Sequence, residues 1–261
     1  MRMPTDRTAA RSAEVNKTIE DLVEANHILA EQGTVDGFGH VSVRHPTNPT
    51  RYLLSKNVAP AAVTKDDIIE LDLDSVPVDA KGRALYLERF IHGEIYKARP
   101  DVQSVVNAHS PWVLSFAANK IPLRAVHNKA AFLGAGSPIF DVRDAFGATD
   151  MLLTTPAQAK ALAETLGKSA VVLLRGHGHV AVGPSLRVAV FRAYYAEFNA
   201  RLQAQAMSLG GSITYVEGDE AVKADQTMQR VDQRPWALWQ ASVKAKAATP
   251  KARPKARRRT R

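Results

Sequence analysis

The stretch LERFIHGEIYKARPDVQSVVNAHSP, residues 87–111, carries a helical pattern and a strand pattern in immediate succession. Its first part has apolar residues at helical spacing and ends at Arg99-Pro100, where proline disfavours further helix. The apolar run that follows predicts a strand, which ends in polar residues at Asn107 and His109. Because a helix leads directly into a buried strand, this stretch favours an α/β fold with polar groups at a sheet edge.

The rest of the chain extends the same alternation. Helical periodicity covers residues 12–33, 155–167 and 185–210, and strand patterns cover 39–45, 51–55, 68–74 and 170–178, with short strand candidates at 122–127 and 138–142. Mixed elements in this order predict a single α/β domain, a three-layer αβα sandwich around a central mixed sheet. We expect this domain to span 13–239, after a disordered N-terminus at 1–12 and before a basic disordered tail at 240–261.

The positive charge is concentrated in that tail. The chain has 35 Lys and Arg against 26 Asp and Glu, a formal net charge of +9. Residues 240–261 contain nine of the basic residues and no acid, which leaves 26 of each sign in residues 1–239. A weak contact of the tail with a polyanion is one interpretation. A solvated extension is favoured, because residues 1–239 contain no nucleic-acid-binding motif.

Composition excludes several classes of protein. The chain has no cysteine, so disulfides, thiolate nucleophiles and cysteine-ligated zinc are excluded. No apolar run approaches the ~20 residues of a membrane helix, and the first residues lack the apolar core of a secretory signal. With 45% hydrophobic residues the chain can bury a substantial core. We therefore expect a soluble, cytoplasmic protein without a membrane partner.

Three side chains form a candidate metal site. Glu88 and His92 lie on one face of the first helix in the quoted stretch, because they are four residues apart. His109 and His177 each follow an apolar strand, and strand ends meet at one sheet edge. Glu88, His109 and His177 would give a carboxylate and two imidazoles with open positions for substrate. The alternative is that these histidines are simply hydrogen-bonded at strand ends.

Three motifs strengthen the metal interpretation. GHVSVR at 39–44, the helix at 88–96 followed by KARPDVQSVVNAHSP, and LLRGHGHVAVG at 173–183 resemble the class II aldolase/adducin family over roughly residues 15–215. The resemblance implies an αβα sandwich and a cyclic homotetramer with active sites at subunit interfaces. It also implies a divalent metal held by residues that match Asn107, His109 and His177, with Glu88 acting in proton transfer.

Two departures from the family pattern bear on the substrate. The family's His-x-His is Asn107-Ala108-His109, which replaces an imidazole by a harder amide ligand. The site would then shift toward Mn²⁺, recruit Glu88 or His179, bind metal weakly, or lose it. The alternative for Asn107 is a hydrogen-bonding residue beside an inactive site. The sugar-phosphate aldolases also carry Gly-Asn-x-Ser and a small-residue phosphate loop, where this chain has Gly39-His40-Val41-Ser42 and LLSKNVAP. A phosphorylated sugar is therefore disfavoured.

DGFGHVSVRHP, YLERFIHGEIY and VHNKAAFLG resemble a narrower branch of aromatic-acid decarboxylases that includes one acting on 3-hydroxy-2-methylpyridine-4,5-dicarboxylate. The resemblance implies a Mn²⁺- or Zn²⁺-dependent lyase that decarboxylates a hydroxylated aromatic or heteroaromatic carboxylate. Glu88 or His179 would return a proton to the ring. The residues expected to hold a second carboxylate are His40, Ser42, Arg44, Ser55 and Lys56. An aldolase cleaving a hydroxy-carbonyl substrate and a non-catalytic adducin-like scaffold are the alternatives.

Overall fold

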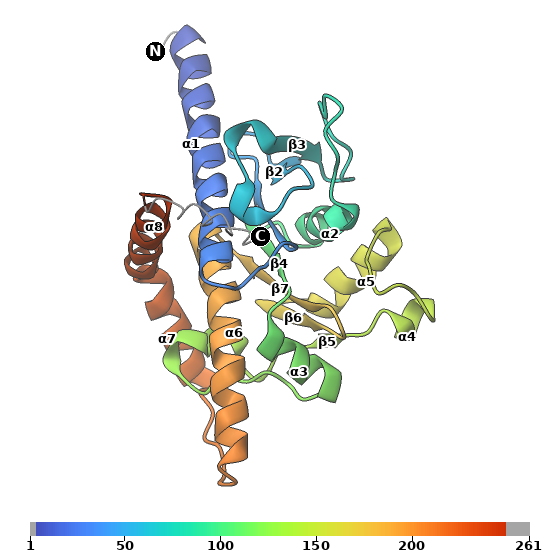
Figure 1. Ribbon diagram of the computed structural model, residues 1–261, viewed down its shortest axis with the longest axis vertical. Coiled ribbons are helices and arrows are strands. Elements are labelled where there is room, and N and C mark those ends of the chain that lie inside the picture. The colour runs from blue at the N-terminus through green and yellow to red at the C-terminus, as the bar shows by residue number, and fades with distance from the viewer. Residues whose placement is uncertain (1–3, 249–261) are drawn as a thin grey trace, which may run out of the picture.

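Seven strands form one mixed sheet in the computed structural model, which describes residues 4–248 (Figure 1). The order across the sheet is β3-β2-β1-β4-β7-β6-β5. Every neighbouring pair is antiparallel except β5 and β6, which are parallel. The strand bounds are β1 His40–Arg44, β2 Arg51–Ser55, β3 Ile68–Asp72, β4 Ser104–Ala108, β5 Ile139–Phe140, β6 Val171–Leu174 and β7 Gly178–Gly183.

Helices cover both faces of the sheet, which confirms the predicted three-layer αβα sandwich (Figure 1). α1, α3 and α6 pack on one face, and α2 and α5 pack on the other. The helix bounds are α1 Pro4–Glu31, α2 Phe90–Ala98, α3 Pro111–Asn119, α4 Arg143–Phe146, α5 Pro156–Leu166, α6 Leu186–Ser208, α7 Gly218–Arg230 and α8 Gln233–Ala248. The 3₁₀-helices are the single turns η1 Pro60–Ala62, η2 Lys65–Asp67 and η3 Leu87–Arg89, and the longer η4 Asn128–Leu133.

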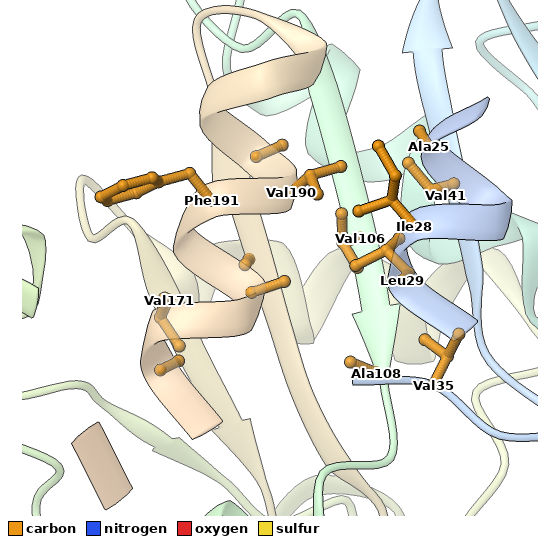
Figure 2. Close-up of a cluster of buried hydrophobic side chains, with 14 of the residues drawn as sticks. Ala25, Ile28, Leu29, Val35, Val41, Val106, Ala108, Val171, Val190 and Phe191 are labelled. Atoms are coloured by element: carbon orange, nitrogen blue, oxygen red, sulfur yellow. The ribbon is translucent and has the colours of Figure 1, made fainter. Parts of the chain in front are cut away.

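The sheet separates two apolar cores because successive strand residues point to opposite faces. On β4, Val106 packs in the core under α1 and α6, whereas Val105 packs in the core under α2 and α5. Figure 2 shows the first of these cores, with Ile28 of α1 and Val190 of α6 meeting over β4. Burial of each Ile or Val side chain stabilises the fold by about 1.5–3 kcal/mol relative to an exposed side chain. The two cores therefore hold the sheet firmly between its helices.

Side-chain caps fix the ends of the helices around the sheet. Thr155 accepts a hydrogen bond from the Gln158 N–H at the start of α5, and Ser185 accepts one from the Val188 N–H at the start of α6. Such caps stabilise a helix start by about 1 kcal/mol. At the other end of α2, the buried guanidinium of Arg44 donates to the carbonyls of Tyr96 and Arg99. The helix α2, which follows Glu88, is therefore fixed where it ends.

The structure differs from the sequence predictions in several elements. α1 begins at Pro4 rather than at residue 12, and α8 continues through Gln240 to Ala248, where a disordered tail was expected. Residues 249–261, the rest of the predicted tail, lie outside the described residues. Residues 122–127 form no strand, because the N–H groups of Arg124 and Val126 bond to side chains of α6 instead. β7 was not predicted. Within residues 4–248, no helix combines the length and apolarity that crossing a membrane requires.

Candidate functional site

Glu88, His109 and His177 come together at one edge of the sheet. Glu88 lies in η3, His109 follows β4, and His177 precedes β7. One ligand atom from each lies within 4.8 Å of the others. The Nε2 atoms of His109 and His177 are 3.1 Å apart, and the Nε2 atom of His177 is 3.3 Å from Oε2 of Glu88. The three residues expected from the sequence therefore form one cluster.

A glycine allows the two histidines to approach each other. Gly178 begins β7 directly after His177 and has a φ of 151°, a conformation that side chains rarely adopt. A β-carbon at this position would lie 2.0 Å from the carbonyl oxygen of Ala108. Because Gly178 has no β-carbon, the start of β7 lies against the end of β4 and brings His177 beside His109.

Glu88 is buried and ionised. The residue lies at a kink between η3 and α2, with φ −90° and ψ 17°, and 7% of it is exposed. Its Oε1 accepts a hydrogen bond of 2.9 Å from the Leu153 N–H. Burial acts to raise the pKa of Glu88, but the contact with His177 and the hydrogen bond from the Leu153 N–H together lower it below its ordinary value. The cluster therefore contains a carboxylate at neutral pH.

His109 is partly accessible from solvent and is flanked by a loop. Burial is the main cause that lowers its pKa, with a further effect from His177, so the imidazole is neutral at pH 7. Asp36 places Oδ1 3.8 Å from its Nδ1, on the side opposite to His177. Phe38, two residues further along the loop, is 73% exposed and meets the His109 ring edge to face, with 6.4 Å between ring centroids. An aromatic surface therefore lies beside the cluster.

The arrangement of these donors fits a divalent ion. Two nitrogens that each lie about 2.1 Å from one ion are separated by about 3.0–3.4 Å, and the Nε2 atoms of His109 and His177 are 3.1 Å apart. Neutral imidazoles and a carboxylate are suitable ligands for Zn²⁺ and Mn²⁺. Glu88, His109 and His177 could therefore hold an ion together.

Asn107 adds a buried oxygen without a partner. The residue is fully buried on β4, two positions before His109. Its Nδ2 is 3.3 Å from Nε2 of His40, but within the described part of the chain its Oδ1 has no hydrogen-bond partner. Burying an unpaired amide oxygen costs about 1–3 kcal/mol. Such an oxygen is consistent with a further ligand to the same ion, although the three-residue cluster is defined without it.

The residues expected to bind a substrate carboxylate form hydrogen bonds or ion pairs with other groups of the protein. Arg44 is 7% exposed and donates to the carbonyls of Val102, Pro49, Tyr96 and Arg99. Ser42 is fully buried against His92 and Tyr96. Ser55 donates to the Tyr86 hydroxyl, and Lys56 pairs with Asp67 at 2.7 Å. The expectation for Ser42, Arg44 and Ser55 is corrected, because their buried donors hold strands and loops together. The side chain of Lys56 is 36% exposed, and its role stays a prediction. His40 is also hydrogen-bonded inside the protein, and it pairs across the sheet with Asn107, two residues before His109.

His179 lies on the other face of the sheet. It pairs with Ala108 across β4 and β7, and Ala108 packs in the core under α1 and α6. The side chain is fully buried, and the backbone of Ala193 on α6 affects its pKa. The expectation that His179 returns a proton to substrate is corrected, because the period of two along β7 points this ring away from Glu88.

Sequence reasoning missed Phe38 and the role of His92. Phe38 stands between two glycines in the quoted motif DGFGHVSVRHP, and an exposed aromatic residue in such a loop was a usable signal. His92 was identified only by its spacing from Glu88. It is fully buried and hydrogen-bonded to both His40 and Ser42, a pairing across 50 residues that no local pattern indicates.

Comparison with known proteins agrees with this geometry. Residues 20–204 match the model of the class II aldolase and adducin N-terminal domain. The chain belongs to the class II aldolase and adducin family. The match includes the whole of the sheet and all three residues of the cluster. The predicted resemblance to this family is therefore confirmed.

Relatives within the class II aldolase and adducin family include decarboxylases. Decarboxylase tropJ from Talaromyces stipitatus is 33% identical and aligns with 85% of this chain and 92% of its own. The 3,4-dihydroxyphthalate decarboxylase of Arthrobacter keyseri is 29% identical, over 74% of this chain and 80% of its own. L-fuculose 1-phosphate aldolase from Glaciozyma antarctica has the same fold, with a TM-score of 0.71 at 21% identity, covering 90% of this chain and 91% of its own. Such relatives support assigning a lyase.

Proposed function

We propose that this protein is a metal-dependent decarboxylase of a hydroxylated aromatic or heteroaromatic carboxylate. The observation that carries the proposal is the cluster of Glu88, His109 and His177, with two imidazole nitrogens 3.1 Å apart beside a buried carboxylate. When bound there, a divalent ion supplies a Lewis acid for a hydroxyl and an adjacent carboxylate of the substrate. His109 and His177 would hold the ion, with Glu88 and Asn107 supplying oxygens.

Glu88 moves the proton in this proposal. Because its pKa is lowered, the resting group is a carboxylate that can accept the proton of the substrate hydroxyl. The bond between the ring carbon and its carboxylate then breaks, carbon dioxide leaves, and the electron pair remains with the ring. Glu88 returns the proton to that carbon, and the product leaves as a phenolate. The atoms balance without a second acid, which removes the requirement for His179.

Two features of the site favour an aromatic acid over a sugar phosphate. Phe38 presents an exposed ring beside His109, and an aromatic substrate can stack on such a surface. Ser42 and Ser55, which lie in the segments that correspond to the phosphate loops of the aldolases, are buried and hydrogen-bonded internally. These two hydroxyls are therefore not free to bind a phosphate, and cleavage of a phosphorylated sugar is disfavoured.

We propose a homotetramer with active sites at subunit interfaces as the working assembly. Phe38 is 73% exposed and the side chain of His109 is 19% exposed, so the cluster is open to solvent on this side. A neighbouring subunit placed against Phe38 would provide the wall that excludes water from the site. Light scattering on the purified chain measures its oligomeric state. A chain that is monomeric under assay conditions and still decarboxylates the substrate would contradict the proposal.

Release of carbon dioxide tests the proposed reaction. Purified protein would be incubated with ortho-hydroxy aromatic diacids, including 3,4-dihydroxyphthalate, with Mn²⁺ or Zn²⁺ and with a chelator. We expect carbon dioxide from at least one diacid, dependent on added metal. L-fuculose 1-phosphate in the same panel reports aldol cleavage. Inactivity toward all acids, together with cleavage of the sugar phosphate, would establish the aldolase alternative. Inactivity toward every compound and no bound metal would favour a non-catalytic scaffold.

A further inference from the structure

A buried line of hydrogen bonds connects Asn107 to the interior of the protein. Nδ2 of Asn107 is 3.3 Å from Nε2 of His40, and Nδ1 of His40 is 2.6 Å from Nε2 of His92. Nδ1 of His92 is in turn 2.6 Å from the Ser42 hydroxyl, which is 2.7 Å from the Tyr96 hydroxyl. Each of these five residues is at most 3% exposed. Water therefore does not compete for their hydrogen bonds.

The direction of these hydrogen bonds follows from the chemistry of the groups. His40 and His92 are both buried, and the 2.6 Å between Nδ1 of His40 and Nε2 of His92 places a single N–H between the two rings. An amide nitrogen only donates, so Nε2 of His40 accepts from Asn107. The His40 proton is then on Nδ1 and is donated to Nε2 of His92. His92 correspondingly donates from Nδ1 to the Ser42 hydroxyl.

This direction determines which atom of the Asn107 side chain remains free. The amide nitrogen is engaged with His40, and within the described part of the chain Oδ1 has no partner. His40 pairs with Asn107 across β1 and β4, and His109 of the candidate metal site follows two residues after Asn107 at the end of β4. Reversing the amide would place two N–H donors where Oδ1 now lies, and N–H groups repel a cation.

We propose that His40 and His92 are positioning residues that hold the Asn107 amide with its oxygen available to the metal, and so shift the selectivity of the site from Zn²⁺ toward Mn²⁺. The inference builds on the metal site of the proposed function. A ligand set of two imidazole nitrogens, one carboxylate oxygen and one amide oxygen is harder than the three-histidine set of the family motif. Partners of metal ligands typically change affinity by about 10–100-fold when they are removed.

The test is metal affinity, measured by calorimetry on the full-length, metal-free protein without substrate. His40→Phe removes the partner of the amide, and we expect Mn²⁺ to bind at least about tenfold more weakly, with a smaller change for Zn²⁺. Asn107→His restores a three-histidine set and should shift the Zn²⁺/Mn²⁺ affinity ratio toward Zn²⁺ by about tenfold or more. Adding His40→Phe to Asn107→His should then leave that ratio within about twofold, because no amide remains to be oriented.

Further variants keep the proposal testable if His40→Phe does not fold. His92→Leu breaks the line one residue further from the metal and should weaken Mn²⁺ binding in the same direction, whereas His92→Gln keeps an acceptor facing His40 and should restore it. His127→Phe is the matched control, since its ring contacts Tyr195 and Phe198 outside the line. Unchanged Mn²⁺ affinity and unchanged metal ratio in both His40→Phe and His92→Leu would overturn the proposal. Because no turnover is measured, a wrong substrate class leaves this result intact.

Discussion

At the scale of single residues, some roles follow from local sequence patterns, whereas others depend on contacts with distant residues. Glu88, His109 and His177 were predictable from the sequence, because a carboxylate on a helix and histidines after strands are local patterns. Arg44 and His179 were not, because their roles depend on partners that are distant in sequence and on the face of a strand that had not been predicted. A charged or aromatic side chain in a motif can therefore be assigned to a functional site only once the residues that it contacts are known.

Removing the charge of Glu88 tests its role in proton transfer. Glu88→Gln keeps the size of the side chain and its contact with the Leu153 N–H, but it cannot accept a proton, so we expect kcat to fall by about 10²–10⁴-fold. Steady-state carbon dioxide release measures this. Glu94→Gln makes the same substitution in α2 at a residue that pairs with Lys97, and its turnover should match the unaltered protein. Equal rates for both variants would refute the assignment.

Phe38 offers a test of substrate class. Truncation by Phe38→Ala removes an exposed ring beside His109, and loss of one stacking contact of about 0.5–1.5 kcal/mol should raise KM by about 2–12-fold with a smaller effect on kcat. Phe146→Ala removes a ring that is 38% exposed from α4 and serves as the control. If the KM for an aromatic acid is the same in both variants, the substrate does not contact Phe38.

At the scale of elements, the site depends on how β7 meets β4. β7 was missed in the sequence because its two glycines and His179 obscure the alternation, although the strand before it was predicted. Gly178→Ala would place a β-carbon 2.0 Å from the Ala108 carbonyl oxygen, so the strands must separate and carry His177 away from His109. We expect a loss of stability of about 1–3 kcal/mol or more, with weakened metal binding.

Denaturant unfolding and metal titration measure the two effects of Gly178→Ala. Gly211→Ala is the matched control, because no atom lies within 4 Å of the β-carbon it would add. The control should keep the stability and the metal affinity of the unaltered protein. Should Gly178→Ala bind metal as tightly as Gly211→Ala does, the contact between the start of β7 and the end of β4 does not position His177.

At the scale of the whole molecule, burial of neutral histidines makes the fold sensitive to acid. The alternation of helices and strands indicated three layers, but which polar residues these layers enclose depends on packing between distant segments. Burial lowers the pKa of His179 to about 4 and that of His92 to about 3, against about 6.5 in an unfolded chain. Below about pH 6.5 the unfolded chain therefore binds protons that the folded protein excludes.

This linkage predicts that stability falls as the pH decreases from about 6.5 to about 4, by at most about 1.4 kcal/mol per pH unit for each buried histidine. His179→Leu removes one of these groups and fills the same space under α6, so its denaturant stability should decrease less between pH 7 and pH 5 than that of the unaltered protein. It should also keep its Mn²⁺ affinity, since the ring faces away from Glu88. If the stability of His179→Leu depends on pH as that of the unaltered protein does, His179 is protonated equally in the folded and the unfolded chain. A loss of metal affinity would return His179 to the site.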